Sequence, residues 1–116
     1  MLFRSLDPGS TAYLDRAIGN FLRNSVTGME DIRAAIAAGD ATALRHSSHK
    51  LAGGALNLGV GYAGEAVRRI EAIADTGTTE GAAELLDEVE DALARGREAL
   101  TAYQDRYRAE LGAGQD

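Results

Sequence analysis

Two histidines and the only lysine of this 116-residue chain lie within five positions, at His46, His49 and Lys50. A neutral imidazole, whose pKa in peptides is about 6.5, has a free nitrogen that can act as a nucleophile near neutral pH. Such a nitrogen can attack a phosphoryl group, a reaction that depends mainly on in-line approach and charge neutralisation. The sequence contains no nucleotide-binding Gly-x-x-x-x-Gly-Lys loop and no cysteine. Histidine chemistry is therefore the chemistry that this sequence favours.

The histidines lie in a predicted helix that begins after Asp40, a good N-cap, and ends before Gly59, a good residue for the position after a helix. At about 100° per residue, its apolar residues form one stripe. The stripe consists of Leu44, Ser48, Leu51, Ala55 and Leu58. His49 lies about 140° from the centre of this stripe, so we expect its imidazole to face solvent.

Two glycines follow His49 in the middle of the same helix, where each costs about 0.8–1 kcal/mol relative to alanine. Gly54 points toward the edge of the apolar stripe, and close packing against another helix would explain it. Gly53 shares the outward face with His49, where packing does not require a glycine. Clearance for a partner protein that must reach the imidazole explains Gly53 better.

One stretch resembles the motif of histidine-containing phosphotransfer (HPt) domains: His49-Lys50-Leu51-Ala52-Gly53-Gly54-Ala55, followed by Leu58-Gly59 and Ile70-Glu71. The family pattern is His-x-Leu-Lys-Gly-Ser/Ala-Ala, then Leu/Ile-Gly and a downstream Leu-Glu. Ala38-Gly39-Asp40 also looks like the family's turn into the active helix, so the resemblance extends from about Phe21 to Gly77. The sequence departs from the pattern at Ala52, where the family has a lysine, and Lys50 is the nearest cation on the helix.

The resemblance implies that His49 is the phosphoacceptor of a phosphorelay and shuttles a phosphoryl group between receiver-domain aspartates. It implies response-regulator receiver domains as partners, with the receiver of a hybrid sensor kinase as one option. The protein would be a phosphoryl carrier rather than an enzyme, without a cofactor or metal, because magnesium is expected only in the partner. We expect phosphate or partner contacts from residues around the imidazole: Lys50, Gly53, Arg45, His46, Leu56 and Asn57.

Several of these residues also have plainer interpretations. His46 lies about 60° from His49 around the helix and would suit an ordinary solvated surface. Leu56 lies about 20° from His49, where it would form an exposed docking patch or be covered by the end loop. Arg68 and Arg69 would either add positive potential near the site or pair with glutamates. The sequence does not decide between these alternatives.

Two other functions stay open. His46 and His49 have an i, i+3 spacing that could bind a metal ion, with an acidic ligand from another helix. The absence of the family lysine at Ala52 leaves room for a bundle that is not phosphorylated. Such a bundle would bind a receiver or kinase domain as an inhibitor or scaffold.

The composition predicts one domain over 1–116 and excludes several partners. The net charge of −6 argues against nucleic-acid binding, which requires clustered basic residues. No run approaches the roughly 18 apolar residues of a membrane span, and Met1–Arg4 is too short for a signal peptide. We therefore expect a monomeric cytoplasmic protein.

Apolar spacing near 3.6 residues and little strand-like alternation predict an all-α fold. We expect an antiparallel up-down-up-down four-helix bundle with an additional N-terminal helix, because the turns are short. Residues 1–9 would be an N-terminal lead and residues 112–116 a flexible tail. The predicted helices besides the active one are 11–24, 27–38 (or a kinked continuation of the first), 62–75, and one from Thr79 through Gly96. The last third of the final helix would overhang the bundle or pack against the first helix, with Tyr13 as a candidate contact.

Overall fold

The chain folds into four α-helices and one short 3₁₀-helix. They are α2 (Gly9–Ala38), α3 (Ala41–Asn57), α4 (Gly61–Asp75), the 3₁₀-helix η1 (Ala83–Leu85) and α5 (Leu86–Gly114). The computed structural model describes the backbone of residues 9–114 and the side chains of residues 12–110. No strand occurs between residues 9 and 114, so the predicted all-α class is confirmed. No helix within this range is long and apolar enough to cross a membrane.

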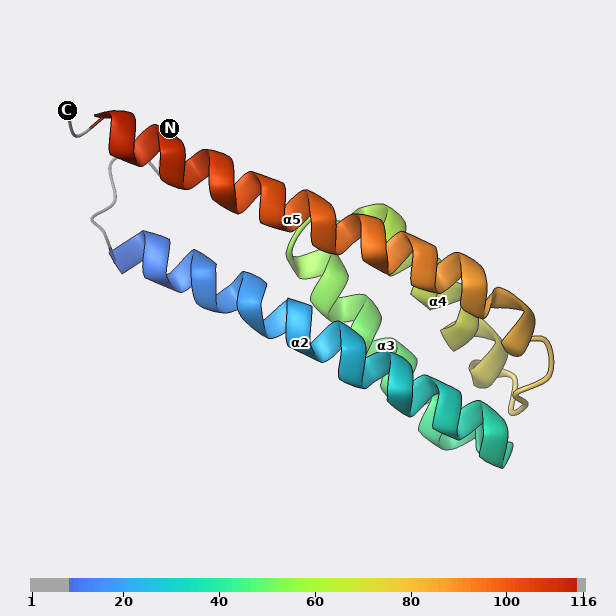
Figure 1. Ribbon diagram of the computed structural model, residues 1–116. Helices are drawn as coiled ribbons and strands as arrows, with labels where there is room; N and C mark the ends of the chain where they lie inside the picture. Colours follow the sequence, from blue (N-terminus) through green and yellow to red (C-terminus); the bar gives the residue numbers. More distant parts are fainter. Residues whose placement is uncertain (1–8, 115–116) are drawn as a thin grey trace.

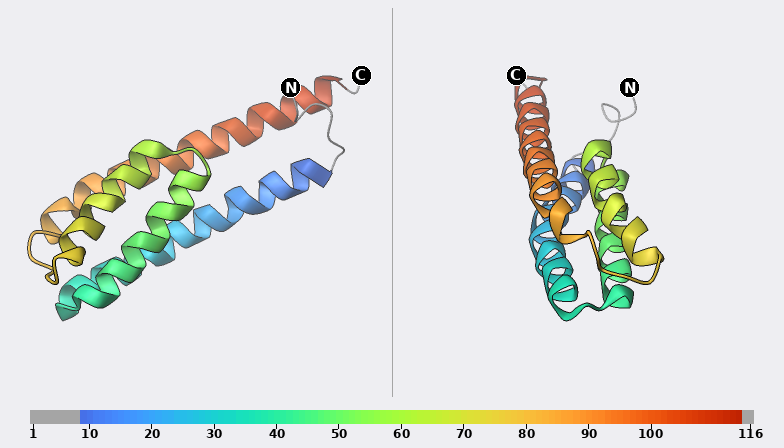
Figure 2. Two further views of the ribbon diagram at one scale, coloured as in Figure 1. Left: turned by 180° about the vertical axis from the view of Figure 1, so that it is seen from behind. Right: turned by 90° about the vertical axis from the view of Figure 1, so that its right-hand side faces the viewer.

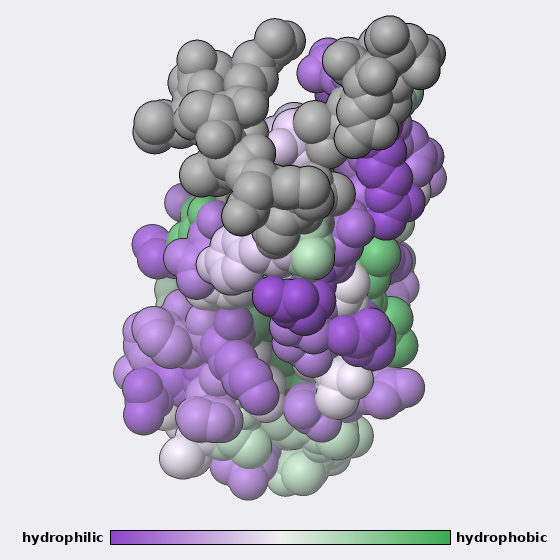
Figure 3. Space-filling model, turned by 90° about the vertical axis from the view of Figure 1, so that its left-hand side faces the viewer, coloured by the Kyte–Doolittle hydropathy of each residue, from purple (hydrophilic) through white to green (hydrophobic). Residues whose placement is uncertain are grey.

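The helices form an elongated bundle with dimensions of 56 × 20 × 20 Å (Figure 1). The long helices α2 and α5 lie side by side along the bundle, and the shorter α3 and α4 lie together on one side of them (Figure 2). α3 has its most extensive contacts with α4, followed by those with α2. The start of α2 and the end of α5 extend beyond α3 and α4, and Figure 3 shows this end with a mostly hydrophilic surface.

Aliphatic side chains from all four helices form the core. Its largest fully buried apolar members are Ile18, Ile32, Leu44, Ile70 and Leu93. Complete burial of such a side chain stabilises the fold by about 1.5–3 kcal/mol. The core therefore joins α3, which carries both histidines, to the other three helices.

The two buried polar side chains among the described residues are both serines with hydrogen-bond partners. The Ser48 hydroxyl donates to the carbonyl of Leu44 in α3 at 2.7 Å. Ser25 of α2 accepts a hydrogen bond from Arg97 of α5 at 3.1 Å. These contacts satisfy the hydroxyls, which would otherwise cost free energy when buried.

α2 is one continuous helix, so the prediction of separate helices over 11–24 and 27–38 is wrong, and the described residues contain no additional N-terminal helix. The alternative of one longer helix is what the structure has. The second helix was expected to begin at Thr27, but the hydroxyl of this residue donates to the carbonyl of Arg23 one turn earlier, at 3.3 Å. A threonine that bonds within the helix in this way does not end it.

α3 begins and ends where the sequence predicts. The Asp40 side chain accepts a hydrogen bond from the backbone N–H of Ala43 at 3.0 Å, as an N-cap does. Gly59 has a φ of 81°, a left-handed conformation that glycine adopts without steric cost. α4 likewise starts within one residue of its predicted range and ends at Asp75.

The predicted start of the last helix at Thr79 is wrong, because α5 begins at Leu86. Gly77 and Gly81 have φ values of 87° and 88°, in the left-handed region through which no right-handed helix continues. Turns and η1 therefore fill the segment before Leu86.

From Leu86 onward, α5 is continuous through Gly96, as predicted. A Cβ at Gly96 would lie 3.3 Å from Cγ1 of Val60, so the glycine allows α5 to approach the turn before α4. The helix extends to Gly114, so most of the predicted tail is helical, and residues 115–116 lie outside the described residues. Residues 1–8 of the predicted N-terminal lead also lie outside them, and Gly9 belongs to α2.

The last third of α5 packs along α2, which was one of the two expected arrangements. Asp15 of α2 accepts a hydrogen bond from Gln104 at 2.6 Å and lies 3.2 Å from the guanidinium of Arg108. Tyr13 does not make this contact, because 68% of the residue is exposed. A polar contact rather than an aromatic one thus joins the two helix ends.

Candidate functional site

His49 projects from the outer face of α3, with 74% of its side chain exposed. Its Nδ1 lies 2.7 Å from Oε2 of Glu71 on α4. An ionised carboxylate can only accept hydrogen bonds, so Glu71 favours the form of the neutral ring with the proton on Nδ1. In that form Nε2 keeps its lone pair, and it has no hydrogen-bond partner in the part of the chain that the structure describes.

Glu71 is a candidate site residue that sequence reasoning did not identify. Its place in the motif was noted, but its contact with His49 was not predicted. A signal was present, because residues equally far from the turn between two antiparallel helices face one another. His49 and Glu71 are equally far from Val60, which lies in the turn between α3 and α4.

A second contact has the same register one helical turn away. Nε of Arg45 lies 4.0 Å from Oδ1 of Asp75 on α4, and both side chains are more than half exposed. Arg45, predicted as a phosphate or partner contact, is therefore beside His49 but is already near a carboxylate. An exposed ion pair of this kind contributes about 0.2–1 kcal/mol at most.

Leu56 is not the fully exposed side chain that the wheel position suggested. It is half-buried, because it lies over the backbone of Gly64 on α4. A Cβ at Gly64 would be only 2.7 Å from Cγ of Leu56, closer than real side chains approach. The expectation of an exposed docking patch is corrected accordingly: Leu56 packs over Gly64 of α4.

Of the two adjacent glycines of α3, Gly53 is open as predicted, whereas close packing does not require a glycine at Gly54. A Cβ at Gly53 would meet no atom within 4 Å, so nothing inside the protein requires a glycine there. A Cβ at Gly54 would lie 3.8 Å from the ring of Phe21, which is an ordinary contact with α2. The space one turn after His49 is therefore open to a partner.

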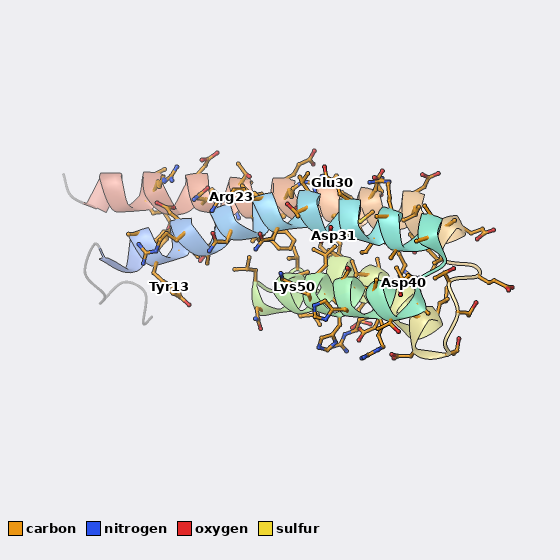
Figure 4. The ribbon with its side chains drawn as sticks, turned by 90° about the horizontal axis from the view of Figure 1, so that it is seen from below. Tyr13, Arg23, Glu30, Asp31, Asp40 and Lys50 are labelled. Atoms are coloured by element: carbon orange, nitrogen blue, oxygen red, sulfur yellow. The ribbon has the colours of Figure 1, made fainter. Side chains whose placement is uncertain are left out.

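A groove with a volume of about 670 Å³ lies between α2 and α3, on the other side of α3 from Glu71. His46, Lys50 and Asn57 line it from α3, and Asp31 lines it from α2. Figure 4 shows Lys50 and Asp31 on facing sides of the two helices. Neither of these two side chains has an ion pair within residues 12–110.

The predicted site residues thus form two groups instead of one. Arg45, His49 and Gly53 lie on the edge that faces α4 or the open surface next to it. The groove group consists of His46, Lys50 and Asn57. Within the described chain, no three histidine, aspartate or glutamate side chains are close enough together to hold a metal ion.

Comparisons with known proteins show the family to which the chain belongs. Residues 16–99 match the family model of the Hpt domain. The fold is similar to the crystal structure of histidine-containing phosphotransfer protein B (HptB) from Pseudomonas aeruginosa PAO1, with a TM-score of 0.72 and 28% sequence identity. The similarity covers 88% of this chain and 96% of HptB, whereas a search of curated proteins gave no match. Because the family model spans most of the sequence, the chain belongs to the Hpt domain family, whose members carry phosphoryl groups on histidine in phosphorelays.

Proposed function

We propose that His49 is the phosphoacceptor and that it exchanges a phosphoryl group with the aspartate of a receiver domain. The contact between Nδ1 of His49 and Glu71 carries this proposal, because it leaves Nε2 free on an exposed ring. His46 is exposed too, but no hydrogen bond in the described chain fixes its ring. His49 is therefore the better prepared nucleophile of the two.

In the transfer step, the lone pair of Nε2 attacks the phosphorus of the partner's aspartyl phosphate. The Nε2–P bond forms while the bond from phosphorus to the aspartate oxygen breaks, and the aspartate leaves as a carboxylate. The ring of His49 keeps its Nδ1 proton and becomes positively charged. The carboxylate of Glu71 stabilises this charge through a charge-assisted hydrogen bond. Because no proton needs to move, the step can run in either direction.

The partner supplies the remaining chemistry in this proposal. Its receiver domain brings the magnesium ion and most contacts to the transferring phosphoryl group, so this chain acts as a carrier and needs no cofactor. The open space at Gly53 supports close approach of that domain. The groove residues His46, Lys50 and Asn57 are proposed to contact the partner rather than the phosphoryl group.

We also infer the predicted up-down-up-down connection of the four helices. The turns after α2 and α3 support it, since each is short enough to return the chain alongside the helix just completed. The monomeric state, the cytoplasmic location, a hybrid sensor kinase as one partner and the lack of nucleic-acid or membrane partners stay predictions.

The test is phosphotransfer profiling with radiolabelled, phosphorylated receiver domains from the source organism. The wild type and His46→Gln should acquire acid-labile label, whereas His49→Gln should acquire none. Equal labelling of His49→Gln and the wild type would reject the assignment. Tight binding of a phosphorylated receiver without any transfer would favour the scaffold alternative instead.

A further inference from the structure

The family motif has a lysine three residues after the histidine, and this chain has Ala52 there. Ala52 is 1% exposed, because it lies in the core of the bundle. A phosphoryl group on His49 would also lie near the carboxylate of Glu71, which carries the same sign of charge. A cation beside the phosphoryl group is therefore needed more in this chain than at a site without a carboxylate.

Of the four cationic side chains near His49, two lie close to a carboxylate and a third lines the groove. Arg45 lies near Asp75, and Arg69 contacts Glu88 of α5 at 2.5 Å. Lys50 lines the groove toward α2, as Figure 4 shows, whereas His49 is held toward α4. These cations are poorly placed to contact a phosphoryl group on Nε2.

Arg68 is the fourth cation, and it lies on the edge of α4 that faces α3. Gly64, Glu71 and Asp75 of this edge contact Leu56, His49 and Arg45, respectively. At about 100° per residue, position 68 falls within about 60° of all three α4 residues around the helix axis.

The register also fixes how far along the helices Arg68 lies. Like the contacting pairs, Ala52 and Arg68 are equally far from Val60, so they lie at the same level of the α3–α4 pair. Arg68 is about 4.5 Å along the axis from Glu71, on the side toward the open space at Gly53. Its side chain is exposed and has no ion pair or hydrogen bond within the described chain.

We propose that Arg68 supplies the cation that contacts the phosphoryl group on His49, in place of the lysine missing at Ala52. This inference rests on the proposed function of His49. A guanidinium can donate two parallel hydrogen bonds to two phosphoryl oxygens, which a lysine cannot do. Arg68 would offset the repulsion between the phosphoryl group and Glu71 without taking part in bond formation.

The experiment uses the full chain with His46→Gln, so that only His49 is phosphorylated by potassium phosphoramidate. The phosphoryl group is then titrated by ³¹P NMR. In Arg68→Ala, the midpoint of its second ionisation should rise by about 0.5–1 pH unit, since loss of a nearby cation disfavours the dianion. Arg68→Lys should restore most of the shift. Arg106→Ala is the matched control, because it removes one exposed arginine near the far end of α5.

The same variants are then compared in transfer from a phosphorylated receiver. Arg68→Ala should transfer about three- to tenfold more slowly than the wild type and Arg106→Ala. An unchanged ³¹P midpoint in Arg68→Ala overturns the role of Arg68, even if His49 accepts label normally. Failure of every receiver to label the wild type overturns the proposed function instead, and the ³¹P titration still decides whether Arg68 contacts the phosphoryl group.

Discussion

The contact between Glu71 and His49 allows a quantitative prediction. Glu71→Ala removes the acceptor of the Nδ1 proton, so the two forms of the neutral ring become closer in free energy. A hydrogen bond to a charged group contributes about 1.5–3 kcal/mol in a shielded site, and an exposed ion pair about 0.2–1 kcal/mol. The carboxylate is 17% exposed and the ring 74% exposed, so we expect about 1 kcal/mol, between these limits. This free energy corresponds to a factor of about five.

Two measurements on Glu71→Ala check this value. Long-range ¹H–¹⁵N NMR gives the ratio of the two protonated ring nitrogens of neutral His49, which should shift about fivefold toward Nε2–H. The rate of transfer from a phosphorylated receiver at saturation should fall about as much or more, because Glu71 also stabilises the charged ring of phosphohistidine. Glu65→Ala is the control, since it removes an exposed carboxylate of the same helix that has no partner in the described chain.

A wild-type ratio of ring forms in Glu71→Ala, together with a wild-type transfer rate, would refute this reasoning. A slower rate with an unchanged ratio would limit Glu71 to stabilising the product. The same loss in Glu65→Ala would mean that the net charge of α4, and not the contact with His49, controls transfer.

Two further predictions concern the open glycine and acid stability. Gly53→Leu should leave the free energy of unfolding equal to that of the wild type or higher, because a side chain there meets no atom, yet should strongly reduce phosphotransfer. By contrast, Gly64→Ala should lower the free energy of unfolding by about 1–3 kcal/mol, because the added methyl group would overlap with a leucine of α3. Urea titration measures this loss. A hydrogen bond from Gln104 lowers the pKa of the Asp15 carboxyl below its ordinary value of 3.8. The pKa of Asp15 is lower in the folded state than in the unfolded state, so the stabilisation by Asp15 should be complete above pH 3.8. It should decline as the pH falls through the folded-state pKa. Thermal unfolding of the wild type and Asp15→Asn at a series of pH values would show this decline.

The active helix could be predicted closely because its signals are local. The cap at Asp40, the turn at Gly59 and the position of His49 opposite the apolar stripe depend only on nearby residues and helix geometry. The openness at Gly53 followed from the same geometry. The chemically central residue of the candidate site was thus accessible from the sequence, and so was the space beside it.

Contacts between helices were less predictable. Glu71 contacts His49 because of the register between α3 and α4. A helical wheel of α3 alone gives no information about that register. For the same reason, the wheel left open whether Leu56 is exposed or covered by the end loop, whereas it packs over Gly64 of α4. Thr27 and Thr79 misled in another way, because each was taken as the start of a helix. Thr27 instead bonds within α2, and the left-handed Gly81 interrupts the helix that would begin at Thr79.

The arrangement of α3 between two neighbours separates chemistry from docking. α4 holds His49 through Glu71, whereas the groove that includes Lys50 and Asp31 is formed with α2. Changes on the α4 side should therefore alter the transfer rate at saturating receiver, because they act on the reacting nitrogen or the phosphoryl group. Changes at Lys50 or Asp31 should instead alter the receiver concentration needed for half-maximal transfer. Since the Lys50 and His49 positions differ by only about 100° around one helix, a partner that binds in the groove would also be able to reach Nε2.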